Sequence, residues 1–381
     1  MRSDALKSVT PPARDTLAGV PAPPVWLRWL PVLYVAAILA IEPVTPVQWP
    51  VSFLLIALPV VAAFTLGPAG VAGVTLFTVV FEGVLAGTPC CAGRSVGYLW
   101  DRHYVASYLS TALVGALGTA LAAHRKRQEK QLVRATSVTE ALMRTLLRPL
   151  PHEVGHVLTA GLYRPAEAGT MIGGDLFDIR ATRTGERAII GDVRGKGLQA
   201  VRTVADVLGG FRQAVYEPGD LAQVCARLES RMAREAAEIP DDELFVTAAL
   251  IEYDPLAHRL TVINHGHIEP VLISRGEVMT LSGPPSLPLG LGALADERPV
   301  PVHHRFLRGD VLLLCTDGLI EARDVTGAFY PLLDRLRDRF AGVPAPEPID
   351  VIEFLNTDLP AHARALHDDV AVLAISPHER Q

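Results

Sequence analysis

The chain has 381 residues, of which 49% are hydrophobic and 20% are charged, and its formal net charge is −6. This apolar content excludes an intrinsically disordered chain, and the acidic balance argues against nucleic acid as a partner, because phosphate backbones attract basic surfaces. Residues 1–123 carry six Lys or Arg and five Asp or Glu, whereas residues 124–381 have a net charge of −7. We therefore expect an apolar N-terminal part followed by an ordinary acidic globular part.

The N-terminal part has the pattern of a membrane domain. Residues 1–24 contain five prolines and are expected to form a flexible cytoplasmic tail. Within residues 25–123, four apolar stretches approach the roughly 20 residues that a membrane-spanning helix needs: 29–47, 49–66, 70–87 and 104–123. Basic residues stand before the first stretch and after the last, so the positive-inside rule places both ends in the cytoplasm. We expect a multi-pass protein of the cell membrane, with the lipid bilayer as a partner.

Two features connect the predicted membrane domain with a role in signalling. Glu82 is the one ionisable residue deep inside a predicted span, and it either reaches the membrane interface or takes part in sensing. Residues 124–150 follow as a helical linker, because apolar side chains recur there at three- and four-residue spacing and Pro149 ends the pattern. This apolar stripe either pairs with a second copy, which would give a homodimer, or docks on the next domain.

Residues 151–377 form the last part, in which blocks of strands are separated by blocks of helices. Apolar runs bounded by Gly, Asp and Pro predict strands over 156–163, 174–181, 186–193, 244–253, 258–264, 269–274, 310–316 and 369–375. Helices are expected over 196–215, 220–238, 330–340 and 348–358. Strands and helices in separate blocks are typical of an α+β fold with mostly antiparallel sheets.

Aspartates at strand ends carry the chemical signal of this part. Asp175 opens one predicted strand, Asp192 and Asp317 stand at the ends of two others, and the pair Asp368 and Asp369 opens the last. A carboxylate at the end of a buried strand is costly unless it is paired or bound to a metal, and hard divalent cations prefer oxygen ligands. A turn explains each aspartate taken alone, but their repetition favours a two-metal site for phosphate ester hydrolysis.

The loop 193–197 (VRGKG) follows one of these aspartates and precedes a predicted helix. Glycines allow a ligand close to the backbone, and a helix N-terminus attracts anions. Arg194 and Lys196 are therefore candidates for binding a phosphate group, and the alternative is that they are solvated loop charges.

Seven motifs follow one another in this part of the chain: GGDLFD (173–178), GDVRGKGLQA (191–200), LFVTAALIEYD (244–254), NHGHIEPVLI (264–273), LPLGL (287–291), RGDVLLLCTDGLIEARD (308–324) and HDDVAVLAI (367–375). In this order they resemble the bacterial branch of the metal-dependent PPM serine/threonine phosphatases, the type found in stage II sporulation protein E and in regulators of stress sigma factors. The resemblance covers about residues 142–376. It implies an α-β-β-α sandwich, two antiparallel sheets flanked by helices, after the all-α four-helix transmembrane domain.

The resemblance also implies a role for each matching residue. Asp192 matches the carboxylate that bridges two metal ions, and Val193 matches the position whose backbone carbonyl is a further ligand. Asp317 and Asp368 match two other metal-holding acids, and together with Asp192 they form the implied catalytic set.

Two further aspartates belong to the implied metal site. Asp175 matches the acid of the first motif, which acts through a metal-bound water, and Asp369 is the neighbour of Asp368 and the weaker match of the two. Two Mn²⁺ or Mg²⁺ ions per active site are implied, with a bridging hydroxide that attacks phosphorus in line. The chain departs from the family at His265, where NAGH is usual, and we expect this histidine to be structural.

The implied function is that of a membrane-anchored protein serine/threonine phosphatase, a phosphoric monoester hydrolase. The implied substrate is a phosphorylated cytoplasmic regulator, such as an anti-sigma-factor antagonist. Because no kinase-like ATPase module is recognisable in the chain, the partner kinase is expected to be a separate protein.

A competing motif is HEVGH (152–156), which fits the HExxH signature of zinc peptidases. That chemistry requires a helix that turns His152 and His156 to one side, with Glu153 as the base. Pro151 precedes the motif, and a third ligand is missing at the usual spacing. The alternatives to a phosphatase are thus a membrane zinc metallopeptidase or a non-catalytic membrane sensor or binding protein.

Overall fold

The computed structural model describes residues 29–41, 51–87, 99–100, 102–166, 173–238, 244–284, 286–294 and 299–378. The chain divides into two compact units, Met1–Arg134 and Ala135–Gln381, and each is described by itself. The expected tail over 1–24 lies outside the described residues.

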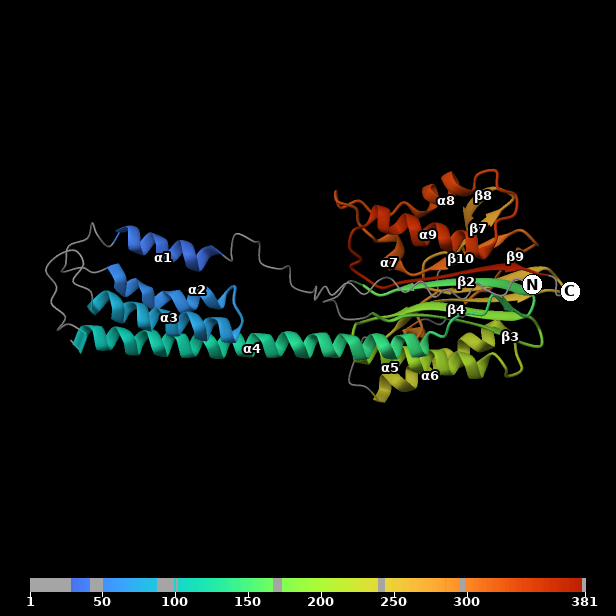
Figure 1. The fold of residues 1–381 in the computed structure, drawn as a ribbon. Helices are drawn as coiled ribbons and strands as arrows, with labels where there is room; N and C mark the ends of the chain where they lie inside the picture. Colours follow the sequence, from blue (N-terminus) through green and yellow to red (C-terminus); the bar gives the residue numbers. More distant parts are fainter. Residues whose placement is uncertain are drawn as a thin grey trace, which may run out of the picture. The chain divides into compact units, whose positions relative to one another are not determined.

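The first unit consists of apolar helices (Figure 1): α1 (Leu30–Ile41), η3 (Val51–Ala57), α2 (Leu58–Ala63), α3 (Pro68–Gly87) and the first part of α4 (Arg102–Leu146). Among the described residues, one helix, over Arg102–Gln128, is long and apolar enough to cross a membrane. The other apolar helices there are shorter: Leu30–Ile41, Leu54–Ala63 and Pro68–Val84. Four spans therefore stay a prediction.

Helices α3 and α4 approach each other closely through small residues. A side chain added at Gly115 on α4 would come within 2.1 Å of the Thr75 side chain on α3, so the contact requires glycine. Glu82 is 5% exposed and accepts hydrogen bonds from Ser107 Oγ (3.3 Å) and Thr111 Oγ1 (2.9 Å). Its carboxylate is thus bound within the helix pair.

The second unit is built on two antiparallel sheets. In the described part of the chain, one sheet has the order β1-β2-β11-β10-β7-β8 and the other has the order β3-β4-β5-β6-β9. The strands are β1 (Glu153–Val154), β2 (Val157–Arg164), β3 (Asp175–Ala181), β4 (Glu186–Val193), β5 (Val246–Asp254), β6 (Arg259–His265), β7 (Val271–Ser274), β8 (Glu277–Thr280), β9 (Val302–Arg305), β10 (Val311–Cys315) and β11 (Val370–Pro377).

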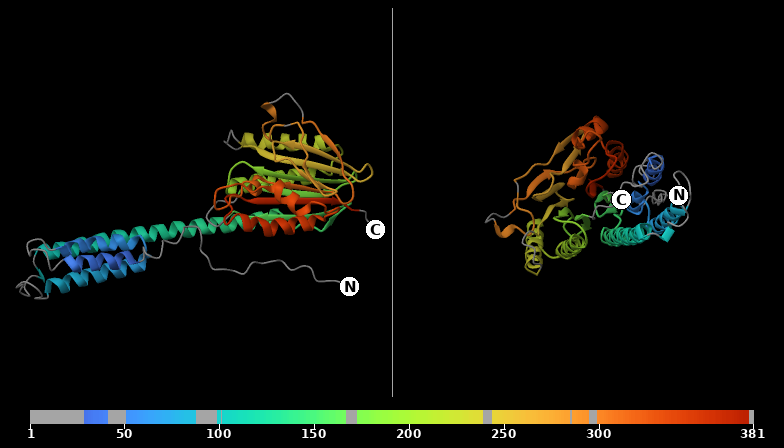
Figure 2. Two further views of the ribbon diagram at one scale, coloured as in Figure 1. Left: turned by 90° about the horizontal axis from the view of Figure 1, so that it is seen from above. Right: turned by 90° about the vertical axis from the view of Figure 1, so that its left-hand side faces the viewer.

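Helices cover the outer face of each sheet, and these helices are α5 (Leu198–Ala214), α6 (Leu221–Glu238), α7 (Asp317–Ile320), α8 (Leu332–Phe340) and α9 (Pro348–His362). Helices α5 and α6 pack on β3, β4, β5 and β6, whereas α9 packs on β2 and β11 and α8 packs on β8. Figures 1 and 2 show the two helix pairs on different sides of the strands. The layers follow the order helix, sheet, sheet, helix, which confirms the sandwich expected from the motifs.

The alternation of side chains along β10 explains how one strand serves two cores. Leu312 and Leu314 belong to the cluster between the sheets and under α5 and α6, while Leu313 and Cys315 belong to the cluster under α8 and α9. Successive strand residues point to opposite faces of a sheet, and here both faces are covered. All five residues of β10 are therefore apolar.

In the second unit, the differences from the expected elements are confined to short segments. Four elements are not predicted by the sequence pattern, and each has at most four residues: β1, β8, β9 and α7. Short edge strands such as β9 (VHHR) contain too few apolar residues to form a periodic signal. The predicted last span and the predicted linker helix form one continuous helix, α4.

Candidate functional site

The first half of the candidate site lies where β3 begins and β4 ends. Asp175 and Asp192 are direct partners in the antiparallel pair of these strands, which puts both side chains on one face of the sheet. Asp175 is 3% exposed and accepts a hydrogen bond from Thr316 Oγ1 at 2.6 Å. Strand register thus brings together two of the predicted acids.

The Val193 backbone lies against Gly174. The Val193 N–H donates to the Gly174 carbonyl at 3.1 Å, and a Cβ at Gly174 would come within 2.4 Å of the Val193 oxygen. Only glycine fits at such a close approach of two backbones. The second glycine of the GGD motif is therefore needed to seat the carbonyl that the family resemblance marks as a ligand.

The second half of the candidate site lies where β10 ends and β11 begins. The Thr316 N–H donates to the Ala371 carbonyl at 3.0 Å and continues the pairing of these strands, so Asp317 and Asp368 lie at the same end of the sheet. The Thr316 hydroxyl donates to Asp175 in the other sheet and accepts from the Ala371 N–H at 2.9 Å. Thr316 therefore joins the two halves.

Burial and mutual repulsion raise the pKa values of these acids. Burial raises the pKa of Asp192 to about 7, and the charges of Asp317 and Asp368 add to the increase. The pKa of Asp175 lies well above its ordinary value, first through burial and then through repulsion by Asp192. The pKa of Asp317 is raised by burial and by Asp368. A cluster of this kind retains protons at neutral pH or attracts cations.

The aspartates are neighbours, but they do not yet form a closed ligand shell. Within the described segments, no three His, Cys, Asp or Glu side chains converge closely enough to hold a metal ion as they stand. Their carboxylates nevertheless fit a divalent cation by chemistry, because oxygen donors and uncompensated negative charge are what Mg²⁺ and Mn²⁺ prefer.

Asp369 has a different environment from the other acids. It is 1% exposed, and its two oxygens accept hydrogen bonds from Tyr163 Oη (2.7 Å), the Ala166 N–H (2.8 Å) and the Gly173 N–H (3.0 Å). These contacts tie the end of β2 and the GGD motif to the start of β11. They are the partners of a structural carboxylate, and its assignment as a metal ligand stays a prediction.

The two predicted phosphate-binding cations lie on the loop between β4 and α5. Lys196 Nζ donates to Asp368 Oδ2 at 2.8 Å. The Arg194 guanidinium lies 5.6 Å from the centre of the Phe245 ring, and its backbone N–H donates to the Phe245 carbonyl at 3.0 Å. Lys196 is therefore in direct contact with Asp368, a predicted metal ligand, whereas Arg194 contacts Phe245, the residue just before β5.

Polar residues beneath the cluster were missed by sequence reasoning. Thr247 is the cross-strand partner of Asp192, and its hydroxyl lies 3.1 Å from His267 Nδ1 and 3.5 Å from the Asp192 carbonyl oxygen. Burial lowers the pKa of His267 to about 4 and keeps it neutral. The side chain of Asn264 makes two hydrogen bonds with the backbone of His267: its Oδ1 accepts from the N–H at 2.7 Å and its Nδ2 donates to the carbonyl at 2.8 Å. The NHGH motif was the signal available in the sequence. His265, for which a structural role was expected, is buried, and its Nδ1 lies 2.9 Å from the Leu287 carbonyl oxygen.

The HEVGH motif lies on a hairpin. Glu153 belongs to β1, Gly155 occupies the turn with a φ of +60°, and His156 Nδ1 lies 3.1 Å from Glu186 Oε1. A zinc peptidase needs both histidines on one face of a helix. Residues 152–156 form a strand and a turn and no helix, so the hypothesis of a zinc peptidase site at HEVGH is wrong.

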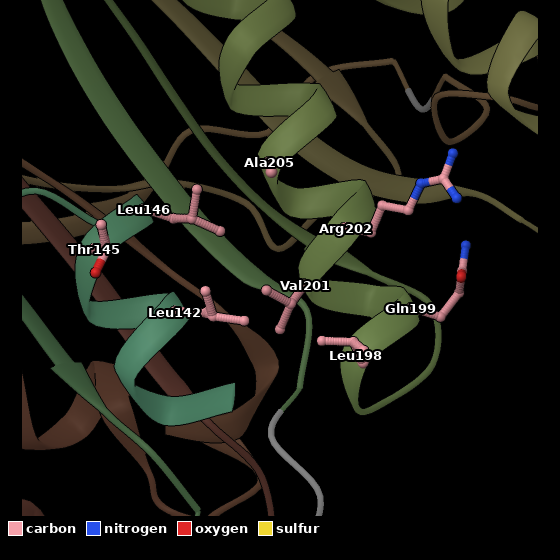
Figure 3. A pocket seen from close by; sticks show the side chains of 8 residues that line it. All are labelled: Leu142, Thr145, Leu146, Leu198, Gln199, Val201, Arg202 and Ala205. Carbon is pink, nitrogen blue, oxygen red and sulfur yellow. The ribbon is translucent and has the colours of Figure 1, made fainter. Parts of the chain in front are cut away.

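An apolar groove of about 500 Å³ lies where the end of α4 meets the start of α5 (Figure 3). Leu142 and Leu146 contribute the apolar stripe of the linker, and Leu198 and Val201 contribute the facing side of α5. Arg212 on α5 also donates to the Leu146 carbonyl at 3.0 Å. The end of the linker thus docks on the helix that follows the candidate site, the second of the two arrangements expected for this stripe.

Solved structures of PP2C-type domains are similar to this chain. The SiaA-PP2C domain of Pseudomonas aeruginosa matches with a TM-score of 0.51 and 19% identity, over 67% of this chain and 99% of that one. A Mycobacterium tuberculosis structure of RsbU and RsbW domains matches with a TM-score of 0.50 and 23% identity, over 60% of this chain and 62% of that one, so the chain spans about three fifths of it. The catalytic domain of the phosphatase PstP, in complex with two manganese ions, matches with a TM-score of 0.41 and 18% identity, over 59% and 99% of the two chains.

The sequence comparison defines the family. No curated protein matches the chain. The model of the stage II sporulation protein E (SpoIIE) family matches residues 183–378, just over half of the chain. This match confirms the resemblance seen in the motifs, and together with the sandwich of the second unit it means that the chain belongs to the SpoIIE family and carries a PP2C-type phosphatase domain.

Proposed function

We propose that this protein is a metal-dependent phosphatase that hydrolyses phosphoserine or phosphothreonine on a protein substrate. The observation that carries the proposal is the meeting of aspartates from two sheets at one end of the sandwich. Buried carboxylates that repel one another favour the binding of divalent cations, which is the first requirement of the chemistry. Membership of the SpoIIE family and the PP2C fold support the same function.

The donor set fits Mn²⁺ or Mg²⁺, and we assign its members by their place in the fold. Asp192 and the Val193 carbonyl at the end of β4 would hold the ions from one sheet. Asp317 and Asp368 would hold them from the other, and Asp175 would act through water. When bound, two such ions lower the pKa of a water molecule and neutralise the charge of phosphoryl oxygens.

The chain's own groups position these acids and receive the phosphate. Thr316 fixes the orientation of Asp175 by its hydroxyl, and Thr247 supports the backbone of the strand that carries Asp192. Arg194 and Lys196 would bind phosphoryl oxygens, because charge-assisted hydrogen bonds to phosphate are among the stronger polar contacts of proteins. Arg194 and Lys196 would thus bind a phosphate monoester next to the aspartates that would hold the metal ions.

The substrate that we infer is a phosphorylated cytoplasmic regulator, such as an anti-sigma-factor antagonist. A separate kinase would be the partner that phosphorylates it. The similarity to a structure containing RsbU and RsbW domains supports a regulatory setting of this kind.

We propose further that residues 25–123 anchor the protein in the cell membrane through four spans. The apolar helix over Arg102–Gln128 supports one of them. In this arrangement the tail over 1–24, the linker over 124–150 and the phosphatase domain over 151–377 are cytoplasmic. A second copy that pairs along the linker helix would make the protein a homodimer.

The test measures hydrolysis of an aryl phosphate by the purified full-length chain while Mn²⁺ and Mg²⁺ are titrated, with Zn²⁺ and EDTA alongside. We expect hydrolysis that depends on Mn²⁺ or Mg²⁺, and we expect Asp192→Asn to lower it by more than about 100-fold. Loss of a residue that only hydrogen-bonds to a metal ligand typically lowers activity about 10- to 100-fold, and loss of the ligand itself should lower it further. Asp334→Asn is the matched control, because its carboxylate is exposed on α8. Equal activity of Asp192→Asn and wild type would contradict the proposal.

A further inference from the structure

The contact between Lys196 and Asp368 joins the two halves of the candidate site. Lys196 lies on the loop that leaves β4, and Asp368 lies just before β11, so the 2.8 Å ion pair links the two sheets. Both side chains are partly exposed, at 37% and 43% of their surface. The ammonium therefore lies in the same cluster of charges as Asp368 and Asp192.

The charges around this ion pair show what the ammonium compensates. Asp317, Asp368 and Asp369 act on Asp192 as repelling charges, whereas Lys196 acts on it as an attracting one. A lysine ammonium is a compact point charge on a flexible stem, and in this respect it resembles a cation more than a guanidinium does. Lys196 thus supplies to the cluster the kind of charge that a metal ion would supply.

The loop that carries Lys196 has open space beside Gly195. Gly195 and Gly197 flank the lysine with φ values of +105° and +85°, and a Cβ at Gly195 would meet no atom within 4 Å. An exposed ion pair of this kind contributes little free energy to the fold. A divalent cation that binds the Asp368 carboxylate would therefore need little free energy to displace Lys196 from it.

We propose that Lys196 is a built-in competitor of the metal ions: it pairs with Asp368 while the site is metal-free and leaves that carboxylate when a metal binds. The proposal rests on the proposed phosphatase function. Release would turn the ammonium from a carboxylate partner into a free cation beside the ions, where a phosphoryl group arrives. Metal loading and substrate binding would then be coupled through one side chain.

The first test measures the dissociation constant of Mn²⁺ from the full-length protein by electron paramagnetic resonance of the free ion. We expect Lys196→Met to bind Mn²⁺ about two- to fivefold more tightly than wild type, because the competing ion pair is lost. Lys196→Arg is expected to stay near wild type, since it keeps a charge that can pair with Asp368. Arg194→Met is the control for the general loss of a positive charge, and its shift should be smaller.

The second test follows the acetylation of lysines by mass spectrometry with and without Mn²⁺. We expect the rate at Lys196 to rise at least about twofold on addition of Mn²⁺, because an ion-paired amine reacts more slowly than a free one. Lys126, which is exposed in the first unit, is the internal control and should not change. In Asp368→Asn the rate at Lys196 should already be high and independent of Mn²⁺.

The outcomes separate this proposal from the function on which it rests. Weaker Mn²⁺ binding by Lys196→Met, or an unchanged acetylation rate at Lys196, would mean that the lysine supports Asp368 in the loaded site and would overturn the competition. An equal shift in Arg194→Met would overturn it too. If wild type binds no Mn²⁺, or if Asp192→Asn binds it as wild type does, the phosphatase proposal fails first.

Discussion

The two halves of the candidate site are built in different ways. In the β3–β4 half, Asp175 and Asp192 are placed by strand register, and Gly174 fits tightly against the neighbouring backbone. In the β10–β11 half, Asp317 and Asp368 lie just outside the strands, and the side chain of Asp368 is 43% exposed. Strand pairing therefore fixes one pair of acids, whereas residues that follow or precede a strand carry the other pair, with Asp317 at the start of α7.

The β3–β4 half is most sensitive to a change of backbone packing. Gly174→Ala would drive a Cβ to within 2.4 Å of the Val193 oxygen, so we expect a loss of about 1–3 kcal/mol in the free energy of unfolding. Metal-dependent hydrolysis should fall by more than about tenfold, because the displaced carbonyl is an assigned ligand. Urea unfolding and aryl phosphate hydrolysis measure the two effects.

A glycine on α5 supplies the control for this prediction. A Cβ at Gly209 meets no atom within 4 Å, so Gly209→Ala should stabilise the helix by about 0.5–1 kcal/mol and leave hydrolysis unchanged. If both alanine variants behave alike, close packing of Gly174 does not define the first half of the site.

The burial of Asp192 and the repulsion between the two halves should appear as a pH-dependent stability of the metal-free protein. Asp192 has a pKa of about 7 in the folded chain against an ordinary value of 3.8. Between these values the folded state holds a proton that the unfolded state has lost, so wild-type stability falls as the pH rises. The stability advantage of Asp192→Asn should therefore grow from pH 4 to pH 7 and stay constant above it.

Urea unfolding in the presence of EDTA measures this advantage. Excess Mn²⁺ at pH 8 should reverse it, because binding to the folded wild type adds stability that the variant lacks. An advantage that shrinks as the pH rises would mean that burial and the neighbouring carboxylates do not raise the pKa of Asp192 in the folded chain.

The link between the halves can be removed without changing a charge. Thr316→Val deletes the hydroxyl that donates to Asp175 and accepts from the Ala371 N–H, and both partners are buried. We expect unfolding to cost about 1–3 kcal/mol less, since buried polar groups are left without partners. Thr316→Ser keeps the hydroxyl and should recover most of that loss, whereas equal destabilisation by both variants would point to packing of the methyl group.

The smallest effect is expected outside both halves. His152→Ala combined with His156→Ala removes the histidines of the HEVGH motif, of which His156 contacts Glu186 at 3.1 Å on the hairpin. The His156 side chain is 47% exposed, and its backbone N–H, which also donates to the buried Glu186 at 2.9 Å, stays in the variant. We therefore expect phosphatase activity within about twofold of wild type and a stability loss below about 1 kcal/mol. Loss of hydrolysis in this variant, with activity retained in Asp192→Asn, would reverse the assignment of the site.

The strands that carry the acids were predictable because their signals are local. Asp192 follows an apolar run and precedes a glycine-rich loop, and Asp317 stands in a TDG turn after another run. The motif order then indicated the sandwich, which the structure confirms. The short edge strands β8 and β9 could not be predicted, because four residues at a sheet edge carry no periodic pattern.

The sequence by itself determined the longer strands and helices of the second unit and which acids stand at the strand ends, because periodicity and turn chemistry act over a few neighbouring residues. Only the tertiary structure decided which of these groups meet. The contact of Thr316 with Asp175 joins residues 141 positions apart, and that of Lys196 with Asp368 joins residues 172 apart. Such contacts arise from the packing of one sheet on the other, and no local pattern encodes them.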